Sequence, residues 1–344
     1  MKKSLIALAV LASTGAMAQS SVTLYGIVDV ALQSAKVTDG VRQNTLASGN
    51  VNGSRFGLKG SEDLGGGLKA LFVLENGFNI DTGASQGGAG LTGLTNTKPA
   101  TAMFGRKAYV GLAGGFGEIR LGNVPTAFDD TAINTNSVFD SNYAPAYSVW
   151  AFNYNNTPGN TVYYASPSFG GLTVAASYAL GENKTATSNA KGLGAVNVQY
   201  AGGPIYASLA YQEDQTAAPG VGLVAGKAHK DTLANFSYDF GVAKLLTSYS
   251  NHVDVSNTKS NQFQIGADVP LGAALTLSGG YAYSKDKLDG VTGAKRDGFG
   301  IGAKYALSKR TFVYTGATYY ETKPAGGVSK VKGDLYAVGV QHSF

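Results

Sequence analysis

Apolar and polar residues alternate strictly along short stretches of this chain, and the pattern is most regular towards the C-terminal end. Between residues 297 and 307, Phe299, Ile301 and Tyr305 share one face, while the opposite face carries glycines and Lys304. Period two over about ten residues is typical of a tilted strand that crosses a membrane. The small, neutral opposite face favours the water-filled lumen of a wide barrel over the charged outer face of a soluble sandwich.

The same alternation predicts strands along the whole chain, joined by connectors that are alternately short and long. The expected strands are 21–33, 53–61, 67–78, 104–113, 116–123, 160–167, 171–180, 192–201, 204–213, 230–240, 242–251, 259–269, 273–285, 295–307, 310–321 and 333–344. Short turns at one end and long loops at the other are typical of a bacterial outer-membrane barrel, whereas the links of a Greek-key sandwich vary irregularly. The sequence therefore predicts an all-β fold, a 16-stranded antiparallel transmembrane β-barrel with short periplasmic turns and long external loops.

One connector, residues 124–159, is long and has no convincing strand. The chain has no Lys or Arg between residues 121 and 183, and this connector carries Asp129, Asp130 and Asp140 besides several aromatic residues. Long connectors in compact domains are usually functional, and the aromatic content argues against disorder. We expect the connector to fold into the barrel, pack on a basic wall and act as a constriction loop. The alternative is a disordered surface loop.

The first residues predict export. A positive n-region, an apolar core of residues 4–12 that is too short to span a bilayer, and a small-x-small motif are the parts of a Sec signal peptide. We therefore expect residues 1–18 to be cleaved off between Ala18 and Gln19, which leaves residues 19–344 as a single transmembrane barrel domain. The alternative is a buried N-terminal helix. No other run approaches the length of a transmembrane helix.

The charge of the chain is mild. It has 27 Lys and Arg against 22 Asp and Glu, and without Lys2 and Lys3 the mature chain has 25 basic residues and a net charge of +3 (25 − 22). No basic run supports nucleic-acid binding. There is no cysteine and no histidine cluster, so we expect no cofactor and no metal site. Asp129 and Asp130 leave Ca²⁺ open, although acidic loops usually carry solvated charge.

Five segments carry a family resemblance. They are SVTLYGIVDV at Ser21–Val30, SRFGLKGSEDL at Ser54–Leu64, GRKAYVGL at Gly105–Leu112, GEIRLGNVPTAFDD at Gly117–Asp130 and YAVGVQHSF at Tyr336–Phe344. In this order, over essentially the whole mature chain, they resemble the trimeric general porins of Gram-negative outer membranes, especially the β-proteobacterial branch. The resemblance implies a 16-stranded barrel, a homotrimer surrounded by outer-membrane lipid and lipopolysaccharide, and an inward-folded third loop. It also implies a water-filled channel for small hydrophilic solutes and inorganic ions.

Two lines of reasoning assign a role to the terminal Phe344. It ends an apolar face of alternating residues, where an aromatic side chain suits the girdle of a barrel at the membrane interface. The resemblance implies in addition that it is the recognition signal for the barrel-assembly machinery.

Family members place basic residues on the barrel wall opposite an acidic third loop. In this chain, the alternation along each strand indicates which of the corresponding side chains face the lumen. The expected basic wall is Arg55, Arg106, Arg120, Lys59 and Lys69, with Lys107 turned outward. The expected acidic side consists of Asp129, Asp130 and Asp140. Further lumen candidates are Asp29, Tyr25 and Glu118, the last as a salt-bridge partner of Arg120. Opposite charges across a narrow lumen create a transverse field that orients water and dipolar solutes.

The resemblance has one departure that bears on selectivity. Residues 150–165 lack the further arginine that family members often carry after the third loop. We therefore expect only a weak preference for anions. The alternative is that the arginines form salt bridges within the wall and have no effect on permeation.

Three other functions stay open from the residues alone. The loop aromatics leave a substrate-specific channel open, although the strand tyrosines lie on the apolar phase. A barrel enzyme would need a nucleophile and a base, but His229, His252 and His342 belong to no catalytic motif. A plugged structural or adhesive barrel would fill its interior with large charged side chains, whereas the predicted lumen face is small. Passive diffusion without catalysis is the function we expect.

Overall fold

The computed structural model describes residues 21–86, 102–151, 154–182, 184–187, 189–215 and 228–344. The predicted signal peptide, residues 1–18, and its cleavage site between Ala18 and Gln19 lie outside the described residues. No helix among those described is both long and apolar enough to cross a membrane.

Strands make up most of the described chain. They are β1 (Ser21–Val37), β2 (Gln43–Ser48), β3 (Arg55–Gly65), β4 (Leu68–Gly77), β5 (Lys107–Gly114), β6 (Gly117–Asn123), β7 (Thr161–Ala165), β8 (Leu172–Ala179), β9 (Leu193–Gly202), β10 (Ile205–Asp214), β11 (His229–Asp239), β12 (Lys244–Val253), β13 (Lys259–Leu271), β14 (Leu275–Leu288), β15 (Val291–Ala306), β16 (Thr311–Lys323) and β17 (Val331–Ser343). The short helical turns are α2 (Asp129–Ala132), η1 (Val138–Asp140), α3 (Pro145–Val149) and η2 (Ala325–Gly327).

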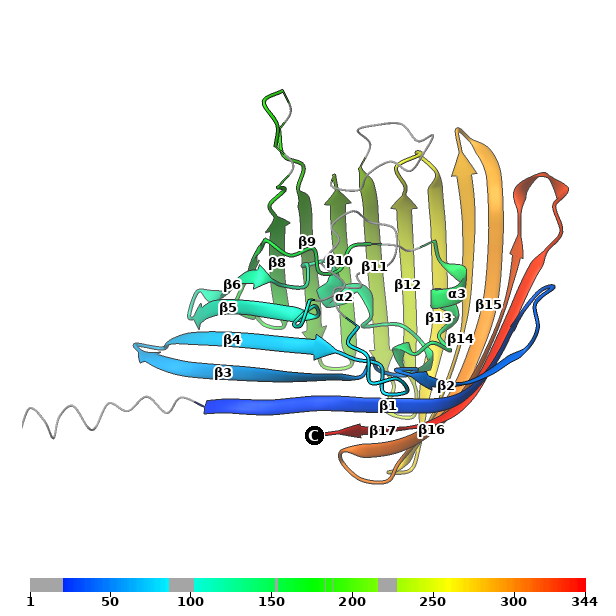
Figure 1. Ribbon diagram of the computed structural model, residues 1–344, viewed down its shortest axis with the longest axis horizontal. Helices are drawn as coiled ribbons and strands as arrows, with labels where there is room; N and C mark the ends of the chain where they lie inside the picture. The colour runs from blue at the N-terminus through cyan, green and yellow to red at the C-terminus, as the bar shows by residue number, and fades with distance from the viewer. Residues whose placement is uncertain (1–20, 87–101, 152–153, 183, 188, 216–227) are drawn as a thin grey trace, which may run out of the picture.

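The strands form one closed antiparallel sheet (Figure 1). Strands that follow one another along the barrel wall are hydrogen-bonded, and β1 closes the barrel by pairing with β17 from Ile27 opposite Ser343 to Val37 opposite Gly333. Each of the expected strands overlaps a strand of this sheet. The prediction of a 16-stranded antiparallel barrel is confirmed.

One described strand, β2, was not expected. β2 and β3 pair with the same edge of β1, β2 along Val30–Ala35 and β3 along Ser21–Ile27. The two therefore make up a single barrel strand that is interrupted at residues 49–54. Gly, Asn and Ser in this segment are typical of a loop, which is why the sequence pattern places the start of the second strand too late.

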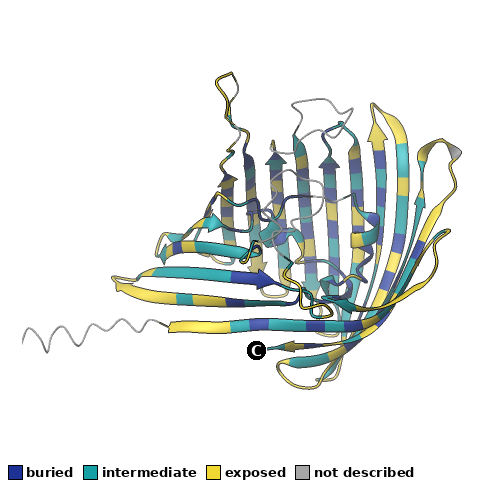
Figure 2. Ribbon diagram, in the orientation of Figure 1, coloured by how far each residue is buried: buried dark blue, intermediate teal, exposed yellow. Residues whose placement is uncertain are grey.

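The two faces of the sheet alternate as the period-two pattern predicts (Figure 2). On β10, Leu209 and Tyr211 are exposed on the outside, whereas Ser208 and Gln212 are buried on the inside. The outward side chains near the C-terminus are Tyr336, Val338, Val340, His342 and Phe344, also as predicted. Because a closed sheet pairs its own backbone groups, its apolar outer face can meet hydrocarbon while polar groups stay inside.

Short turns join the strands at one end of the barrel (Figure 1). In the turn between β9 and β10, Gly203 has a φ of 55°, and between β13 and β14, Gly272 has a φ of 74°. Glycine adopts this left-handed conformation at little cost, which allows such tight hairpins. The connectors at the other end differ in length: the one between β6 and β7 spans residues 124–160, whereas the β14–β15 hairpin turns within residues 289–290.

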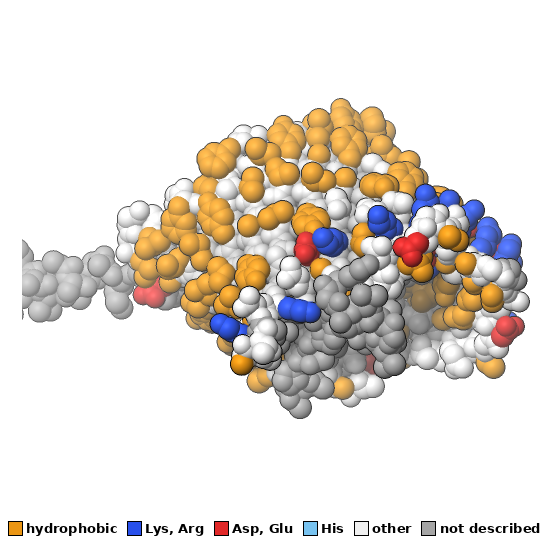
Figure 3. Space-filling view, turned by 90° about the horizontal axis from the view of Figure 1, so that it is seen from above, with side chains coloured by type: hydrophobic (Ala, Val, Ile, Leu, Met, Phe, Trp, Pro, Cys, Tyr) orange, Lys and Arg blue, Asp and Glu red, His pale blue; other side chains and the backbone are white. Residues whose placement is uncertain are grey.

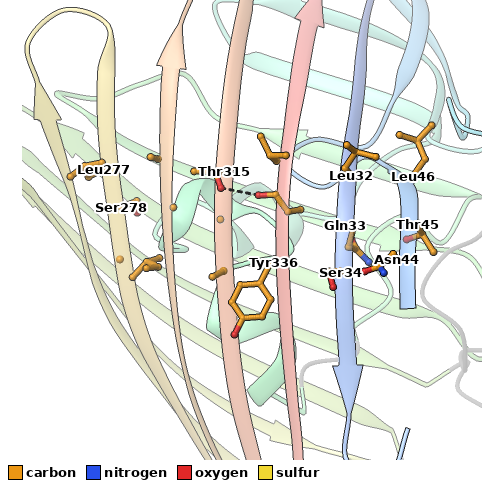
Figure 4. A pocket seen from close by; sticks show the side chains of 18 of the residues that line it. Leu32, Gln33, Ser34, Asn44, Thr45, Leu46, Leu277, Ser278, Thr315 and Tyr336 are labelled. Atoms are coloured by element: carbon orange, nitrogen blue, oxygen red, sulfur yellow. Dashed lines mark hydrogen bonds between the residues drawn. The ribbon is translucent and has the colours of Figure 1, made fainter. Parts of the chain in front are cut away.

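The outer surface has an apolar groove over β13–β17, β1 and β2 (Figure 4). Its volume is about 1200 Å³, and bulky residues such as Leu32, Leu277 and Tyr336 line it together with the small residues Ala303 and Ala317. These side chains have the outward phase of their strands, so the groove is not part of the lumen. It is apolar surface of the kind that contacts lipid or another protein.

Candidate functional site

The connector between β6 and β7 runs through the inside of the barrel (Figure 1). Its short helix α3 packs against β14, β15 and β16. Its side chains Phe128, Val138, Tyr143 and Val149 are almost completely buried. Apart from residues 152–153, which lie outside the described part of the chain, the whole expected constriction loop can therefore be placed.

Glycines on the lumen face of β15 and β16 make room for this loop. A Cβ atom on Gly300 would collide with the carbonyl oxygen of Tyr143, and one on Gly316 would collide with the Tyr143 ring. At Gly302 it would come within 2.9 Å of Val138. The small lumen face was expected to border open space, and over these strands that expectation is wrong. The apolar side chains of the loop rest on this glycine-lined wall, whereas its acids Asp129 and Asp130 lie near basic side chains.

Amide side chains of the lumen face hold the backbone of the loop. Asn235 on β11 donates to the carbonyl oxygen of Thr131 over 2.6 Å, and Gln264 on β13 donates to that of Thr135 over 3.2 Å. Asn197 on β9 donates to a third loop carbonyl. These residues could not be recognised from the sequence, because an amide on the polar face of a strand has the same pattern whether it meets water or a loop.

A cluster of basic side chains surrounds Glu75 on the lumen face of β3, β4 and β5. Nε of Arg106 lies 2.7 Å from Oε1 of Glu75, and the Tyr25 hydroxyl donates to Oε2 of Glu75 over 2.9 Å. Nε of Arg55 donates to the carbonyl oxygen of Gly53 over 2.8 Å, and the Arg55 guanidinium is within electrostatic range of Arg106. Three expected lumen residues, Arg55, Arg106 and Tyr25, are thus brought together.

Lys107 belongs to the same cluster, and the expectation that it points outward is wrong. Val110 and Leu112 are exposed on the outer face of β5, so Lys107 has the inward phase and lies opposite Glu75 in the sheet register. Arg106 precedes the strand and reaches the lumen from the connector. Both basic side chains therefore point inward. Neither Glu75 nor Lys107 was expected in the lumen. Glu75 has the strand phase of Lys69, whereas strict alternation from Arg106 directs Lys107 outward.

Arg120 lies on the lumen face of β6, as predicted. Its Nε lies 2.5 Å from Oε1 of Glu118, which confirms the expected salt bridge. The guanidinium also lies over two aromatic rings, 5.5 Å from the centroid of Tyr109 and 4.7 Å from that of Tyr163. These cation–π contacts hold its charge in place beside the loop.

The two expected wall lysines differ in their distance from the cluster around Glu75. Nζ of Lys59 lies 5.3 Å from the ring centroid of Tyr25. Lys69 precedes Glu75 by six residues on β4, which places it about 20 Å away along the strand. A lumen cation that the analysis did not single out as a site, Lys304 on β15, lies 4.8 Å from the ring centroid of Phe139 in the loop.

Tyrosine hydroxyls hold the three loop acids. The expected acidic residues accept hydrogen bonds from Tyr154 to Asp129 over 2.6 Å, from Tyr163 to Asp130 over 2.6 Å and from Tyr147 to Asp140 over 2.8 Å. Asn136 donates a second bond to Asp140 over 2.6 Å. The acids are thus fixed in place as parts of hydrogen-bonded pairs.

Burial makes these carboxyl groups easier to protonate. It raises the pKa of Asp130 to about 6, although Tyr163 and Arg120 favour the ionised form. Burial also raises the pKa of Asp140 to about 6, and it raises that of Asp129 against the opposing effects of the Tyr154 hydroxyl, Lys107 and Arg106. Asp129 and Asp130 therefore lie near basic side chains, whereas the partners of Asp140 are uncharged.

Asp29 is not a charge that faces the open lumen, contrary to expectation. Its carboxylate is fully buried and accepts bonds of 3.0–3.2 Å from the backbone N–H groups of residues 50–52 and one of 2.6 Å from the Tyr314 hydroxyl. It thereby satisfies the donors at the break between β2 and β3. Asn50 then binds Asn142 of the loop through a 2.8 Å backbone bond and a 2.9 Å side-chain bond. Asp29 supports the anchorage of the loop.

The arrangement can impose a field but suggests no reaction. Basic groups on β3–β6 and acids of the loop set up opposite charges inside a narrow lumen. In the part of the chain that the structure covers, no group of three or more His, Asp or Glu side chains is placed to hold a metal ion. His252 pairs with Asp231 over 2.7 Å, as a buried pair between β11 and β12.

Comparisons with known proteins agree with this architecture. A family model described as Gram-negative porin matches residues 4–325. Outer membrane porin protein 32 of Delftia acidovorans is 36% identical over 359 residues, which cover 99% of this chain and 95% of that protein. An outer membrane porin protein of Bordetella pertussis is 27% identical, with both chains covered completely. A solved structure titled anion-selective porin from Comamonas acidovorans matches with a TM-score of 0.77 and 28% identity, over 95% of this chain and 100% of that one. Because the family model spans nearly the whole barrel, this chain belongs to the Gram-negative porin family of outer-membrane channels.

Proposed function

We propose that this outer-membrane porin passes small hydrophilic solutes and inorganic ions by passive diffusion, with a weak preference for anions. The observation that carries the preference is the balance of charges at the loop. Arg106 is paired with Glu75 and Arg120 with Glu118, which leaves Arg55 and Lys107 to act on the solute path. Burial raises the pKa of the opposing loop acids and so disfavours their charged form. A small excess of positive charge favours anions.

The constriction in this proposal consists of the side chains that approach the loop. They are Arg55, Arg106, Lys107 and Arg120 on the wall and Asp129 and Asp130 on the loop. Lys69 and Asp140 contribute less, because Lys69 lies about 20 Å from Glu75 along β4 and the partners of Asp140 are uncharged. Lys59 contacts the ring of Tyr25. The similarity to a solved porin described as anion-selective supports the sign of the preference.

A conductance measurement tests this function directly. The refolded protein is inserted into a planar bilayer under a KCl gradient. We expect large, stable openings and a zero-current potential on the anion side. A potential on the cation side would give control of selectivity to Asp129 and Asp130, and the absence of conductance from a folded barrel would overturn the proposal of an open pore.

Selectivity is expected to depend on pH. As the pH falls from 7.5 to 5, it passes the pKa of about 6 of Asp130 and Asp140, so both become neutral and the loop loses negative charge. The zero-current potential should therefore move further towards the anion side. The double variant Asp130→Asn/Asp140→Asn is the control. If it keeps the full pH shift, these carboxyl groups are not its source.

We further propose that the chain assembles as a homotrimer, like the porins of its family in general. The apolar groove over β13–β17 offers outward surface for a subunit or for lipid. At the C-terminus, the backbone of Phe344 exchanges two hydrogen bonds with Gly26, of 3.0 and 3.1 Å, and its ring covers Gly26 from outside. This supports a role of Phe344 in barrel closure and in recognition by the assembly machinery. Contact with lipopolysaccharide and export through Sec remain predictions.

The proposal assigns no catalysis to the chain. Its family consists of channels, and the His252–Asp231 pair is buried between strands rather than placed at the loop. A lipase and protease assay on the folded barrel is expected to show no activity.

A further inference from the structure

Two histidines that are far apart in the sequence meet at the loop end of the barrel wall. His229 is the first residue of β11, and His252 lies near the end of β12, where Asp231 is its partner in the sheet register. Their ring centroids are 5.6 Å apart. The sequence predicts no metal site because its histidines form no cluster, and only the folded sheet brings these two together. The pair is separate from the basic cluster around Glu75.

The alternation along β11 and β12 places both histidines on the inner face. Asp231 and Leu233 are buried and share the phase of His229. His252 is only 4% exposed, whereas Tyr249, which has the opposite phase on β12, is 50% exposed on the outside. Figure 3 shows hydrophobic side chains gathered over the outer surface of the wall. The histidine pair therefore belongs to the polar inner face and not to the surface that meets lipid.

The hydrogen bonding of the two rings suits metal ligands. Oδ1 of Asp231 lies 2.7 Å from Nδ1 of His252, so Nε2 is the nitrogen of that ring which can bind an ion. Histidines that bind metals usually donate their other ring N–H to a carboxylate or carbonyl oxygen, which fixes the tautomer and makes the ligand more basic. Nδ1 of His229 is buried and, among the described residues, has no hydrogen-bond partner. Such an atom indicates a bound water molecule or ion.

The spacing of the rings suits one ion between them. A Zn–N bond of about 2.0–2.1 Å places the ion about 3.2 Å from the centroid of each imidazole, and an angle of about 110–120° at the ion then separates the centroids by about 5.2–5.5 Å. The observed separation is 5.6 Å. Imidazole nitrogen suits Zn²⁺, Cu²⁺ and Ni²⁺, whereas Mg²⁺ and Ca²⁺ prefer oxygen ligands.

Acidic side chains around the pair can balance the charge of a cation. Asp214 lies opposite His229 in the sheet register. Asp214, Asp231 and Asp254 all lie within electrostatic range of the His229 ring. Within the described ranges, no group of three or more His, Asp or Glu side chains is placed to hold a metal ion, so water molecules would complete the coordination. An ion held by the two histidines would connect the ends of β11 and β12.

We propose that His229 and His252 bind a divalent transition-metal ion, such as Zn²⁺, on the inner wall of the barrel near its loop end. Nε2 of His252 and a ring nitrogen of His229 are the protein ligands, and Asp231 positions the His252 ring from behind. The bound ion fastens two neighbouring strands to each other and adds positive charge to the inner wall. The inference goes beyond passive diffusion and is independent of the sign of the ion selectivity.

Isothermal titration calorimetry on the refolded, EDTA-washed porin in detergent tests this site, with ZnCl₂ as the probe. We expect one Zn²⁺ to bind per chain. The loss of either ligand, as His229→Gln or His252→Gln, should lower the affinity by more than about tenfold, and Asp231→Asn should lower it by about tenfold. MgCl₂ should not compete with Zn²⁺, because the site offers nitrogen ligands.

The third histidine of the chain provides the matched control. His342 is exposed on the outer face near the C-terminus, and its Nδ1 lies 2.8 Å from the Thr311 hydroxyl, so His342→Gln should leave Zn²⁺ binding unchanged. Equal Zn²⁺ binding by the wild type and by either ligand variant would overturn the proposal. An equal loss in His342→Gln, or competition by Mg²⁺, would do the same, since the binding would then be unspecific.

Electron paramagnetic resonance of bound Cu²⁺ gives a second measurement that needs no variant. The spectrum of the wild-type porin should show coupling to two imidazole nitrogens. Coupling to one nitrogen or to none would contradict a site shared by His229 and His252. Both measurements follow binding in detergent and need no current, so a failure of the proposed pore function would be seen separately in the planar bilayer.

Discussion

Neutralising Arg55 and Arg106 together, as Arg55→Gln/Arg106→Gln, is expected to move the zero-current potential of the pore towards the cation side. A unit charge about 6 Å from an ion in water contributes roughly 0.7 kcal/mol, or about threefold in relative permeability. Removing two cations from the wall should therefore lower the ratio of anion to cation permeability by about tenfold. The measurement is best made near 0.1 M KCl, where the screening length is about 10 Å.

Two further variants show whether the shift comes from this cluster. Without Arg106, the Glu75 side chain, which is only 3% exposed, loses its partner and adds negative charge to the wall. Adding Glu75→Gln should therefore return part of the shift. Lys69→Gln is the matched control, since Lys69 shares the lumen face of β4 but lies far from Glu75. If Lys69→Gln shifts the potential as much as the arginine variant, the effect is one of total charge and the cluster is not the constriction.

The barrel was predictable because one physical rule governs every strand. A sheet with lipid on one side and a polar lumen on the other must alternate, and the alternation is visible without knowledge of any partner. The rule failed where a strand is interrupted. β2 was missed because the break at residues 49–54 is held by Asp29, a residue more than twenty positions away along the chain.

The candidate site was only partly predictable, because the face to which a side chain points depends on the residue at which its strand begins. Arg106 and Lys107 are adjacent, and strict alternation would send them to opposite faces. β5 starts at Lys107, so Arg106 is free of that alternation and both reach the lumen. The glycines opposite the loop were also misread. A glycine next to water and a glycine under Tyr143 look identical in the sequence, and only the folded loop distinguishes them.

Replacing Asp29 with asparagine is expected to destabilise the barrel and loosen the loop. The carboxylate accepts three backbone hydrogen bonds and one from Tyr314. The asparagine amide has the same size but only one accepting oxygen, and its NH2 group would face the N–H donors of the backbone. Hydrogen bonds to charged groups contribute about 1.5–3 kcal/mol each, so Asp29→Asn should lower stability by several kcal/mol in total. The temperature at which the folded form disappears on a denaturing gel should fall.

Single-channel recordings should show the second effect. The segment that Asp29 holds binds the loop through Asn50 and Asn142, so Asp29→Asn should increase the current noise of the open pore. Asn142→Ala removes the side-chain bond of this link but keeps its backbone bond, so it should raise the noise less, with little loss of stability. Tyr314→Phe removes one donor and should have the smaller effect on stability. If Asp29→Asn instead keeps wild-type stability and noise but shifts the zero-current potential towards anions, then Asp29 acts as a charge of the lumen, as its strand phase alone would suggest.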